Sequence, residues 1–453
     1  MFQAIGEWFH RYLIENEVGN AILRVLLLVV PILMIVPLLI WWERRLLSWM
    51  QDRIGPNRVG NITFSKTSRM VPGFLKGKKF KLFGLIQPLA DGVKLFFKED
   101  ITPASVDKLI YFIAPALALF PAFALGGVMP WGPYPSLTPV ADVNIGVLYL
   151  LAISSLGVYG VVLAGYASNN KYSLMGGLRS SAQLISYELA MGMSLACIVL
   201  ATGSLKMTEM IGLQQAPWLS GPGMVDGVVQ QVGGVPYIQN WLIMTPFGLI
   251  AGLIFLVCMV AETNRAPFDL PEAENELIAG YHTEYSSMKF AVFFMGEYAA
   301  MLVFSGIFTT VFLGGWSPLP IRWEAIGLPQ VNDWIYPVAW MFFIGKMMTV
   351  FSVYIWLRAT LPRLRYDQLM NLGWRSLLPL AVTNFIIVGM WLLVSRLYGW
   401  QAGLASMLAA FGAIVAAYLA FRRIITKGQP SFEHRQIELV NQPARRVELV
   451  EGG

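Results

Sequence analysis

The chain has 453 residues, of which 56% are hydrophobic and only 13% are charged, and its mean hydropathy is +0.58. About a quarter of the residues in an ordinary soluble domain are charged, so this composition excludes a solvated globular protein and indicates a core that faces lipid. The net charge of +6 reflects cationic residues gathered at membrane boundaries, and we therefore expect no nucleic-acid partner.

Long apolar runs recur along the chain and predict an all-α integral membrane protein. A helix needs about 20 residues to cross the hydrocarbon layer. We expect eight transmembrane helices and a ninth, Ala- and Gly-rich helix at the C-terminus, with amphipathic cytoplasmic helices between them. The nine spans are expected near Ala21–Trp42, Leu109–Met129, Val143–Tyr166, Ala182–Thr202, Trp241–Ala261, Phe290–Leu313, Val338–Leu357, Ser376–Leu397 and Ala402–Phe421.

The charged connections between these spans predict the domain organisation and the orientation. We expect one membrane domain over residues 1–397, the extra helix at 398–421 and a cytoplasmic tail at 422–453, with charged loops near residues 43–108, 167–182, 262–289 and 358–375. These loops and the tail hold 27 of the 33 Lys and Arg residues. Cationic loops resist translocation, so we predict that they are cytoplasmic and that the N-terminus lies outside. The length and the C-terminal extension favour a bacterial plasma (inner) membrane.

The first connection combines a cationic motif with an amphipathic segment. Residues 43–60 read ERRLLSWMQDRIGPNRVG, in which Gly-Pro-Asn is a turn signal and the Arg residues could bind lipid phosphates. Apolar residues then recur at helical spacing, at Leu82, Ile86, Leu89, Val93 and Phe96. Such a segment is expected either to lie in the membrane interface or to pack against a partner subunit.

Residues 262–288 hold the densest cluster of acids. Six carboxylates stand against a single Arg265; they are Glu262, Asp269, Glu272, Glu274, Glu276 and Glu284. Asp269 and Glu272 fit a capping box, which explains two acids of the six. If a helix begins there, Asp269, Glu272 and Glu276 share one face, and like charges that close raise at least one proton affinity. The cluster indicates a proton-handling site; an acidic loop that docks a basic partner is the alternative.

Three ionisable residues lie inside predicted spans: Glu188, Glu297 and Lys346. A charge near the membrane centre costs about 2.5–3.5 kcal/mol or more, so these residues indicate proton or ion conduction. The structural alternative is a buried ion pair between Lys346 and one of the acids. Cys197 and Cys258 also lie inside spans, and two thiols cannot supply a four-ligand iron–sulfur or zinc site.

Five sequence blocks, in order, resemble one known family. They begin at Glu43 (ERRLLSWMQDRIGPNRVG), Gly84 (GLIQPLADGVKLFFKED), Asn169 (NNKYSLMGGLRSSAQLISYE), Ala261 (the acidic loop, continuing into MKFAVFFMGEY) and Leu357 (LRATLPRLRYDQLMNLGWR). Over about Ala21–Leu397 the chain resembles the H-type membrane subunit of bacterial respiratory complex I, the proton-pumping NADH–quinone oxidoreductase. The mitochondrial counterpart of that family is NADH dehydrogenase subunit 1.

The resemblance implies a subunit that forms the tunnel by which quinone leaves the bilayer and that couples quinone reduction to proton translocation. It assigns proton coupling to Glu262, Asp269, Glu272, Glu274, Glu276, Glu188, Glu297 and Asp91. It places Arg44, Arg53 and Arg265 along the quinone path. It also implies that quinone is the substrate, that this chain binds no cofactor or metal itself, and that FMN and iron–sulfur clusters lie in partner subunits. The implied partners are other complex I membrane subunits, the peripheral subunits of the quinone site, and membrane lipids.

The chain departs from compact members of that family at Asn61–Leu82, at Gln214–Asn240 and from Tyr398 onward. None of these segments interrupts a motif, so they bear on partner contacts. Three alternatives remain. An equivalent membrane subunit of a related hydrogenase or other-donor oxidoreductase would not co-purify with flavin and NADH-binding subunits. A stand-alone cation or proton transporter would be active alone in liposomes. A structural anchor would tolerate acid-to-amide changes.

Overall fold

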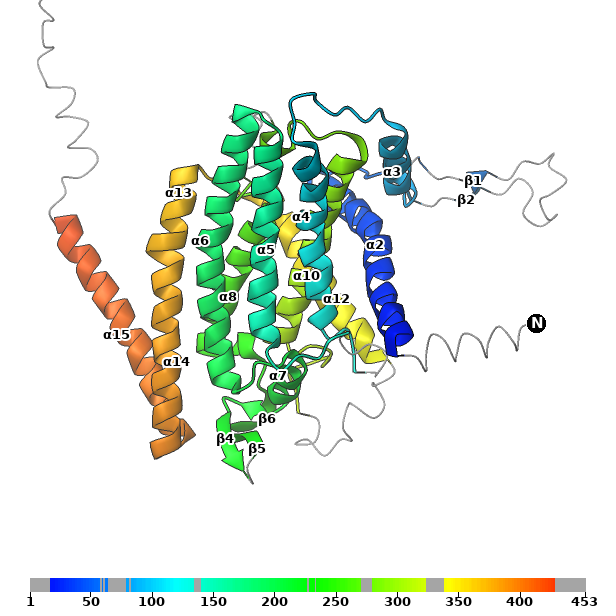
Figure 1. Ribbon diagram of the computed structural model, residues 1–453. Helices are drawn as coiled ribbons and strands as arrows, with labels where there is room; N and C mark the ends of the chain where they lie inside the picture. Colours follow the sequence, from blue (N-terminus) through cyan, green and yellow to red (C-terminus); the bar gives the residue numbers. More distant parts are fainter. Residues whose placement is uncertain are drawn as a thin grey trace, which may run out of the picture.

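Long antiparallel helices run side by side through the molecule, as the computed structural model shows (Figure 1). It describes residues 17–57, 59, 62–63, 79–80, 83–133, 140–225, 228–232, 234–269, 279–322 and 338–427. The long helices are α2 (Glu17–Met50), α4 (Lys108–Val128), α5 (Gly146–Ala167), α6 (Lys171–Thr202), α8 (Pro246–Glu262), α10 (Ser287–Phe312), α12 (Ala339–Thr360), α14 (Leu378–Tyr398) and α15 (Trp400–Lys427).

Seven helices in the described part of the chain are long and apolar enough to cross a membrane. The last of these seven, Tyr366–Tyr398, joins α13 (Tyr366–Asn371), a π-helical turn at Leu372–Leu377 and α14. Two further apolar helices, α8 and the Trp400–Ile414 part of α15, are shorter. The prediction of an all-α integral membrane fold is therefore confirmed.

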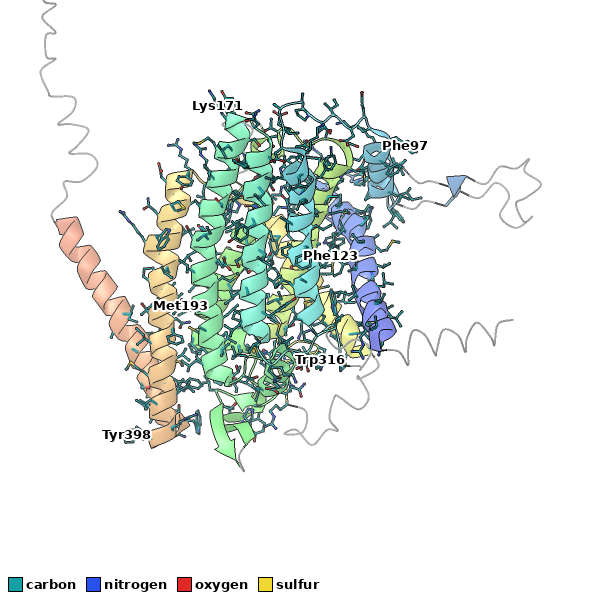
Figure 2. The ribbon with its side chains drawn as sticks, viewed as in Figure 1. Phe97, Phe123, Lys171, Met193, Trp316 and Tyr398 are labelled. Carbon is teal, nitrogen blue, oxygen red and sulfur yellow. The ribbon has the colours of Figure 1, made fainter. Side chains whose placement is uncertain are left out.

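Short elements cover the two ends of the bundle. One end carries α3 (Gln87–Phe97), a 3-10 turn at Gly280–His282 and the two-residue strands β1 (Ile62–Thr63) and β2 (Lys79–Phe80). Phe97 of α3 and Lys171 of α6 mark this end in Figure 2, whereas Tyr398 lies at the other. The other end carries α7 (Met207–Gln214) and two antiparallel pairs, β3 (Pro217–Trp218) with β6 (Val235–Gln239) and β4 (Gly221–Val225) with β5 (Val228–Val232).

Two helices extend beyond the predicted spans toward the α3 end, and in both the reason is buried polarity. The first span was expected to end at Trp42, but α2 continues to Met50 and buries Glu43. The fourth was expected to begin near Ala182, but α6 begins at Lys171, where the Asn170 side chain accepts a hydrogen bond from the Tyr172 amide. Hydropathy does not detect such turns, because their polar side chains are satisfied by neighbouring helices and not by water.

Two other boundaries also differ from prediction. The fifth span was expected from Trp241, but its first residues form a 3-10 turn at Leu242–Met244, and α8 begins at Pro246 with Thr245 as its N-cap. The helix at the C-terminus runs to Lys427, so residues 422–427, predicted to belong to the tail, are helical. Residues 428–453 lie outside the described part of the chain.

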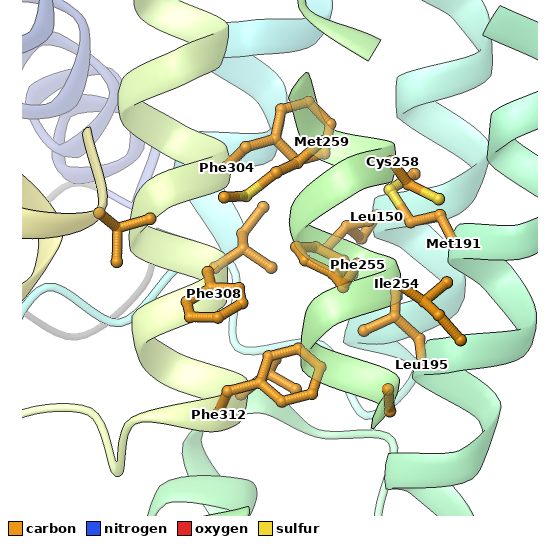
Figure 3. Close-up of a cluster of buried hydrophobic side chains, with 14 of the residues drawn as sticks. Leu150, Met191, Leu195, Ile254, Phe255, Cys258, Met259, Phe304, Phe308 and Phe312 are labelled. Atoms are coloured by element: carbon orange, nitrogen blue, oxygen red, sulfur yellow. The ribbon is translucent and has the colours of Figure 1, made fainter. Parts of the chain in front are cut away.

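The core lies where α8 meets α10 and α6 (Figure 3). Phe255 of α8 packs against Phe312 of α10 with ring centroids 5.6 Å apart, and the Phe308 and Phe312 rings are tilted to each other with centroids 5.0 Å apart. Cys258 is buried in the same cluster. This apolar wall closes the interior of the bundle below the polar groups described next.

The contact between α4 and α5 depends on Gly160. A Cβ added there would lie 2.6 Å from the Ala118 amide nitrogen and 2.8 Å from its Cα, whereas one added at Gly157 would meet nothing closer than 3.8 Å. We expect Gly160→Ala to lower the free energy of unfolding by about 1–3 kcal/mol, since backbone atoms must move apart. Gly157→Ala is the matched control and should be near neutral. A thiol-reactive dye that reports exposure of the two buried cysteines on heating measures both; equal unfolding temperatures would contradict the packing argument.

Candidate functional site

A cavity of about 80 Å³ lies inside the bundle among α4, α5, α10 and the end of α8. Two predicted proton-coupling residues, Glu262 and Glu297, line it. The further polar lining residues are Ser154, Thr263, Asn264 and Tyr281. The rest of the lining is largely apolar, from Pro121 and Leu125 of α4 to Phe304 of α10. The arrangement therefore places two acids around one small, largely apolar cavity inside the bundle.

Glu297 is paired with Arg265, which follows the end of α8. The Arg265 Nη2 atom lies 3.5 Å from Glu297 Oε2, and the exposed fractions of the two side chains are 9% and 11%. The guanidinium carbon also lies 4.5 Å from the centroid of the Tyr298 ring. A buried ion pair has little net effect on stability while intact, but removing one partner leaves an uncompensated charge. Arg265, predicted to lie on the quinone path, is thus placed beside a buried acid.

A second ion pair extends this network across three helices. Glu43 of α2 is buried, and its Oε1 atom forms an ion pair with Nη1 of Arg358 at the end of α12. The Tyr298 hydroxyl of α10 donates to Glu43 Oε2 at 2.6 Å. Sequence reasoning did not assign Glu43 or Arg358, because both were placed just outside predicted spans. The available signal was that Glu43 opens the first of the five sequence blocks.

The turn that carries Arg265 is held by Gln183, a buried amide of α6 that was also not predicted. Gln183 Nε2 donates to the carbonyls of Ala261 and Phe268, each at 2.8 Å. Asp269 follows and pairs with Arg363 at 3.0 Å, so one predicted acid is docked on the segment between α12 and α13. These bonds fix the backbone on both sides of Arg265.

Glu188 and Glu262 lie within electrostatic range of each other. Glu188 is on α6 and Glu262 is the last residue of α8. Glu262 was expected just after the fifth span, in the cytoplasmic connection; in the structure it is the last residue of α8 and faces the cavity. Within the described part of the chain, its Oε2 atom has no hydrogen-bond partner. Three of the predicted acids, Glu188, Glu262 and Glu297, are therefore brought to one region of the interior.

The remaining predicted residues that the structure describes lie at the junction of α2 and α3. Arg44 Nη1 is 2.7 Å from Asp91 Oδ2, and Gln87 Nε2 donates to Asp91 Oδ1 at 3.1 Å. Gln87 also lines a hollow of about 510 Å³ together with Ile54, Gly55, Pro56, Asn57 and Val59. Arg53, whose side chain is exposed, belongs to the same turn. The sequence candidates thus fall into two groups, one inside the bundle and one at its α3 end.

Part of the acidic cluster lies outside the described residues, as does most of the expected capping box. The acids concerned are Glu272, Glu274 and Glu276. Their assignment stays a prediction. Glu284, beyond this segment, accepts a hydrogen bond from Asn170 Nδ2 at 2.7 Å.

Lys346 belongs to α12 and lies away from this site. Its ammonium reaches the C-terminal end of α10. Its ammonium donates to the carbonyls of Leu313 at 2.6 Å, of Gly315 at 3.1 Å and of Ser317, and it lies 3.8 Å from the centroid of the Trp241 ring. The structural alternative was an ion pair between Lys346 and a buried acid. In the structure the ammonium is instead bound by carbonyls at the C-terminal end of α10, where the helix dipole is negative.

His282 is buried beside the cavity among aromatic rings, with the Tyr281 centroid 3.8 Å and the Phe293 centroid 5.1 Å away. Burial lowers its pKa to about 3 from the ordinary value of 6.5. The unfolded chain therefore binds a proton first as the pH falls, so stability is full above about pH 6.5 and declines by about 1.4 kcal/mol per pH unit below it. We expect His282→Phe to remove this decline between pH 6.5 and 5. Thermal unfolding at both pH values checks it, and the same pH dependence in both proteins would show that His282 does not titrate on unfolding.

The fold and the buried network define a multi-pass membrane protein with ionisable groups inside its helical bundle. A profile described as NADH dehydrogenase matches residues 23–389. An H-type subunit of the NADH-quinone oxidoreductase of Geobacter metallireducens is 41% identical over 386 residues, which cover 84% of this chain and 98% of the relative. The H-type subunit of Ralstonia pickettii is 41% identical over 82% of this chain and 92% of its own length. An H-type subunit of Geobacter sulfurreducens is 43% identical, with shares of 82% and 95%.

The chain therefore belongs to the NADH dehydrogenase family and is a membrane subunit of NADH–quinone oxidoreductase, an enzyme complex.

Proposed function

We propose that this chain is the quinone-channel subunit of a proton-translocating NADH–quinone oxidoreductase. It forms the tunnel by which quinone enters and couples quinone reduction to proton translocation. The observation that carries this proposal is the cavity shared by Glu262 and Glu297 inside an apolar bundle. Ionisable residues in such surroundings are costly and are typical of proton pathways.

The cavity supports the proton-coupling part of the proposal. Its volume of about 80 Å³ compares with the roughly 10–15 Å³ that one water needs on the same measure, so it has room for several waters between the two carboxyl groups. Glu188 continues the series on the neighbouring α6. On this proposal a proton that reaches Glu262 passes through waters in the cavity to Glu297, and Glu188 is a further proton carrier on α6.

The hollow beside α3 supports the quinone path. Ligand pockets commonly measure about 300–1,000 Å³, and this one is about 510 Å³ with Ile54, Pro56 and Val59 in its lining. The Arg44–Asp91 pair and Arg53 stand near it and would orient a quinone headgroup, which needs hydrogen-bond donors for its two carbonyl oxygens. The isoprenoid tail would follow the apolar surface between α2 and α3.

The network centred on Glu43 joins the two places. Glu43 and Arg44 are neighbours on α2: Arg44 pairs with Asp91 of α3, and Glu43 reaches Tyr298 beside the Arg265–Glu297 pair. A change of charge at the quinone headgroup would therefore alter the electrostatic balance at the buried acids. We expect the acids of the 262–288 segment to supply the protons; they are Asp269 and, as candidates from the sequence alone, Glu272, Glu274 and Glu276.

The complex and its orientation are part of this proposal. The relatives are named as subunits of NADH-quinone oxidoreductase, so NADH oxidation, FMN and iron–sulfur clusters are expected in partner subunits, with quinone as the substrate met here. The helices alternate in direction, which puts the lysine- and arginine-rich connections at the α3 end. By the positive-inside rule that end faces the cytoplasm of a bacterial plasma membrane.

The test of this proposal is the Glu297→Gln exchange in the assembled complex. Electron transfer to quinone and proton pumping are measured separately, so that loss of coupling is distinguished from loss of turnover. Co-purification of the flavin and NADH-binding subunits identifies the electron donor and would exclude a hydrogenase-type complex.

A further inference from the structure

We infer that Lys289 is a positioning residue that clamps α10, the helix of Glu297, to the segment after α3. This inference rests on the proposed function, since it concerns how the quinone hollow communicates with the buried acid.

The Lys289 ammonium is held from several sides. It lies 3.0 Å from Asp100 Oδ2, donates to Thr102 Oγ1 at 2.9 Å, and stands 4.4 Å from the centroid of the Phe112 ring. The Lys289 side chain is 10% exposed, whereas that of Asp100 is 48% exposed. A half-exposed ion pair alone contributes little, so the specificity of the clamp comes from the combination of carboxylate, hydroxyl and ring around one buried ammonium.

The start of α10 is built to bind the same segment. Ser286 occupies the N-cap position, where a serine ordinarily accepts an amide hydrogen bond of its own helix, yet it makes no such bond. Its Oγ instead accepts from the Ile101 amide at 3.0 Å. Ser287 adopts a φ of 53°, and its hydroxyl donates to the carbonyls of Leu95 at 2.9 Å or Lys98 at 3.1 Å. Helix capping and an unstrained backbone are given up here for contacts with α3 and the residues that follow it.

This junction connects the two functional regions through rigid elements. Glu297 follows Lys289 on the same helix, roughly 12 Å along its axis at 1.5 Å per residue. On the other side, α3 carries Gln87, which lines the hollow, and Asp91, which pairs with Arg44. A displacement of α3 by a molecule in the hollow is therefore transmitted to α10 at Lys289. The clamp thereby fixes the position of Glu297 relative to a quinone bound in the hollow.

The test compares Lys289→Met with Lys289→Arg in the assembled complex. For Lys289→Met we expect kcat for quinone reduction to fall about three- to tenfold and the protons pumped per NADH to fall as well, while KM for quinone changes less than about twofold, because Lys289 does not line the hollow. Lys289→Arg keeps the charge and should retain more than about half of wild-type kcat. Lys108→Met, at an exposed lysine that begins α4, is the matched control and should behave as wild type.

Unchanged kcat and pumping in Lys289→Met, or a loss that Lys289→Arg does not rescue, would overturn the inference. If Lys289→Met fails to assemble, the exchange Lys289→Asp with Asp100→Lys is read against Lys289→Asp alone: higher activity in the double variant supports the clamp, and equal activity overturns it. Wild-type rates in the Lys289→Met complex together with an inactive Glu297→Gln complex would contradict this inference and leave the proposed function intact. A normal Glu297→Gln complex would instead count against the proposed function.

Discussion

The Glu297→Gln complex is expected to assemble and yet to lose about tenfold or more of both NADH-to-quinone electron transfer and proton pumping. Glutamine matches glutamate in shape and cannot take up a proton, so the cavity shared with Glu262 would lose one of the two carboxyl groups that we propose as proton carriers. Positioned acid–base groups typically contribute about 10²- to 10⁴-fold to a rate. Because the proposed function has one site serve both quinone reduction and pumping, both rates should fall together.

Membranes that carry the variant are assayed for quinone reduction and for pH-dye quenching, with assembly checked on a native gel. Glu209→Gln is the matched control, since Glu209 lies on α7 at the opposite end of the bundle, away from the cavity, and accepts from the Ser204 hydroxyl at 2.6 Å. Its complex should retain wild-type rates. Normal rates in the Glu297→Gln complex would make Glu297 a structural residue and restrict the coupling hypothesis to the other acids.

Arg265→Met is expected to lower the free energy of unfolding by about 3 kcal/mol or more. The change keeps most of the side-chain volume but removes the cation 3.5 Å from Glu297, which leaves a buried carboxylate uncompensated. It also removes the guanidinium over the Tyr298 ring. Thermal unfolding of the purified protein, reported by a thiol dye on the buried cysteines, measures the loss.

The double variant Arg265→Met with Glu297→Gln separates charge from packing. If the loss arises from the uncompensated charge, the double variant should recover most of it, since no charge then remains to be compensated. Additive losses would show instead that Arg265 acts through packing and the Tyr298 ring. Arg265→Lys keeps the charge without the planar guanidinium and should lie between the wild type and Arg265→Met.

The helices could largely be predicted from residue order, because the cost of placing polar groups in hydrocarbon acts locally on each run of the chain. The span expected at Leu109–Met129 is α4 at Lys108–Val128, and that expected at Phe290–Leu313 is α10 at Ser287–Phe312. The same rule drew attention to Glu188 and Glu297, since an acid inside an apolar run is conspicuous. It failed at the start of α6, where the helix begins at Lys171, well before the apolar run near Ala182 from which hydropathy alone predicts it. Buried polar residues form the turns between these two positions.

The partners of the buried acids could not be predicted from the local sequence pattern. Glu43 and Arg358 are separated by 315 positions, and neither motif predicts that α2 and α12 meet. Gln183 was missed for the same reason, because the carbonyls that it binds lie at the end of α8 and in the turn after it, about 80 positions away. A lone acid in an apolar run shows that a charge must be compensated, whereas the choice among distant cations depends on which helix faces pack together. Hydropathy is a property of neighbouring residues, but a buried charge is stabilised by whatever the folded chain brings within a few ångströms of it, and in this protein that is set by the packing of α2, α10 and α12 around the end of α8.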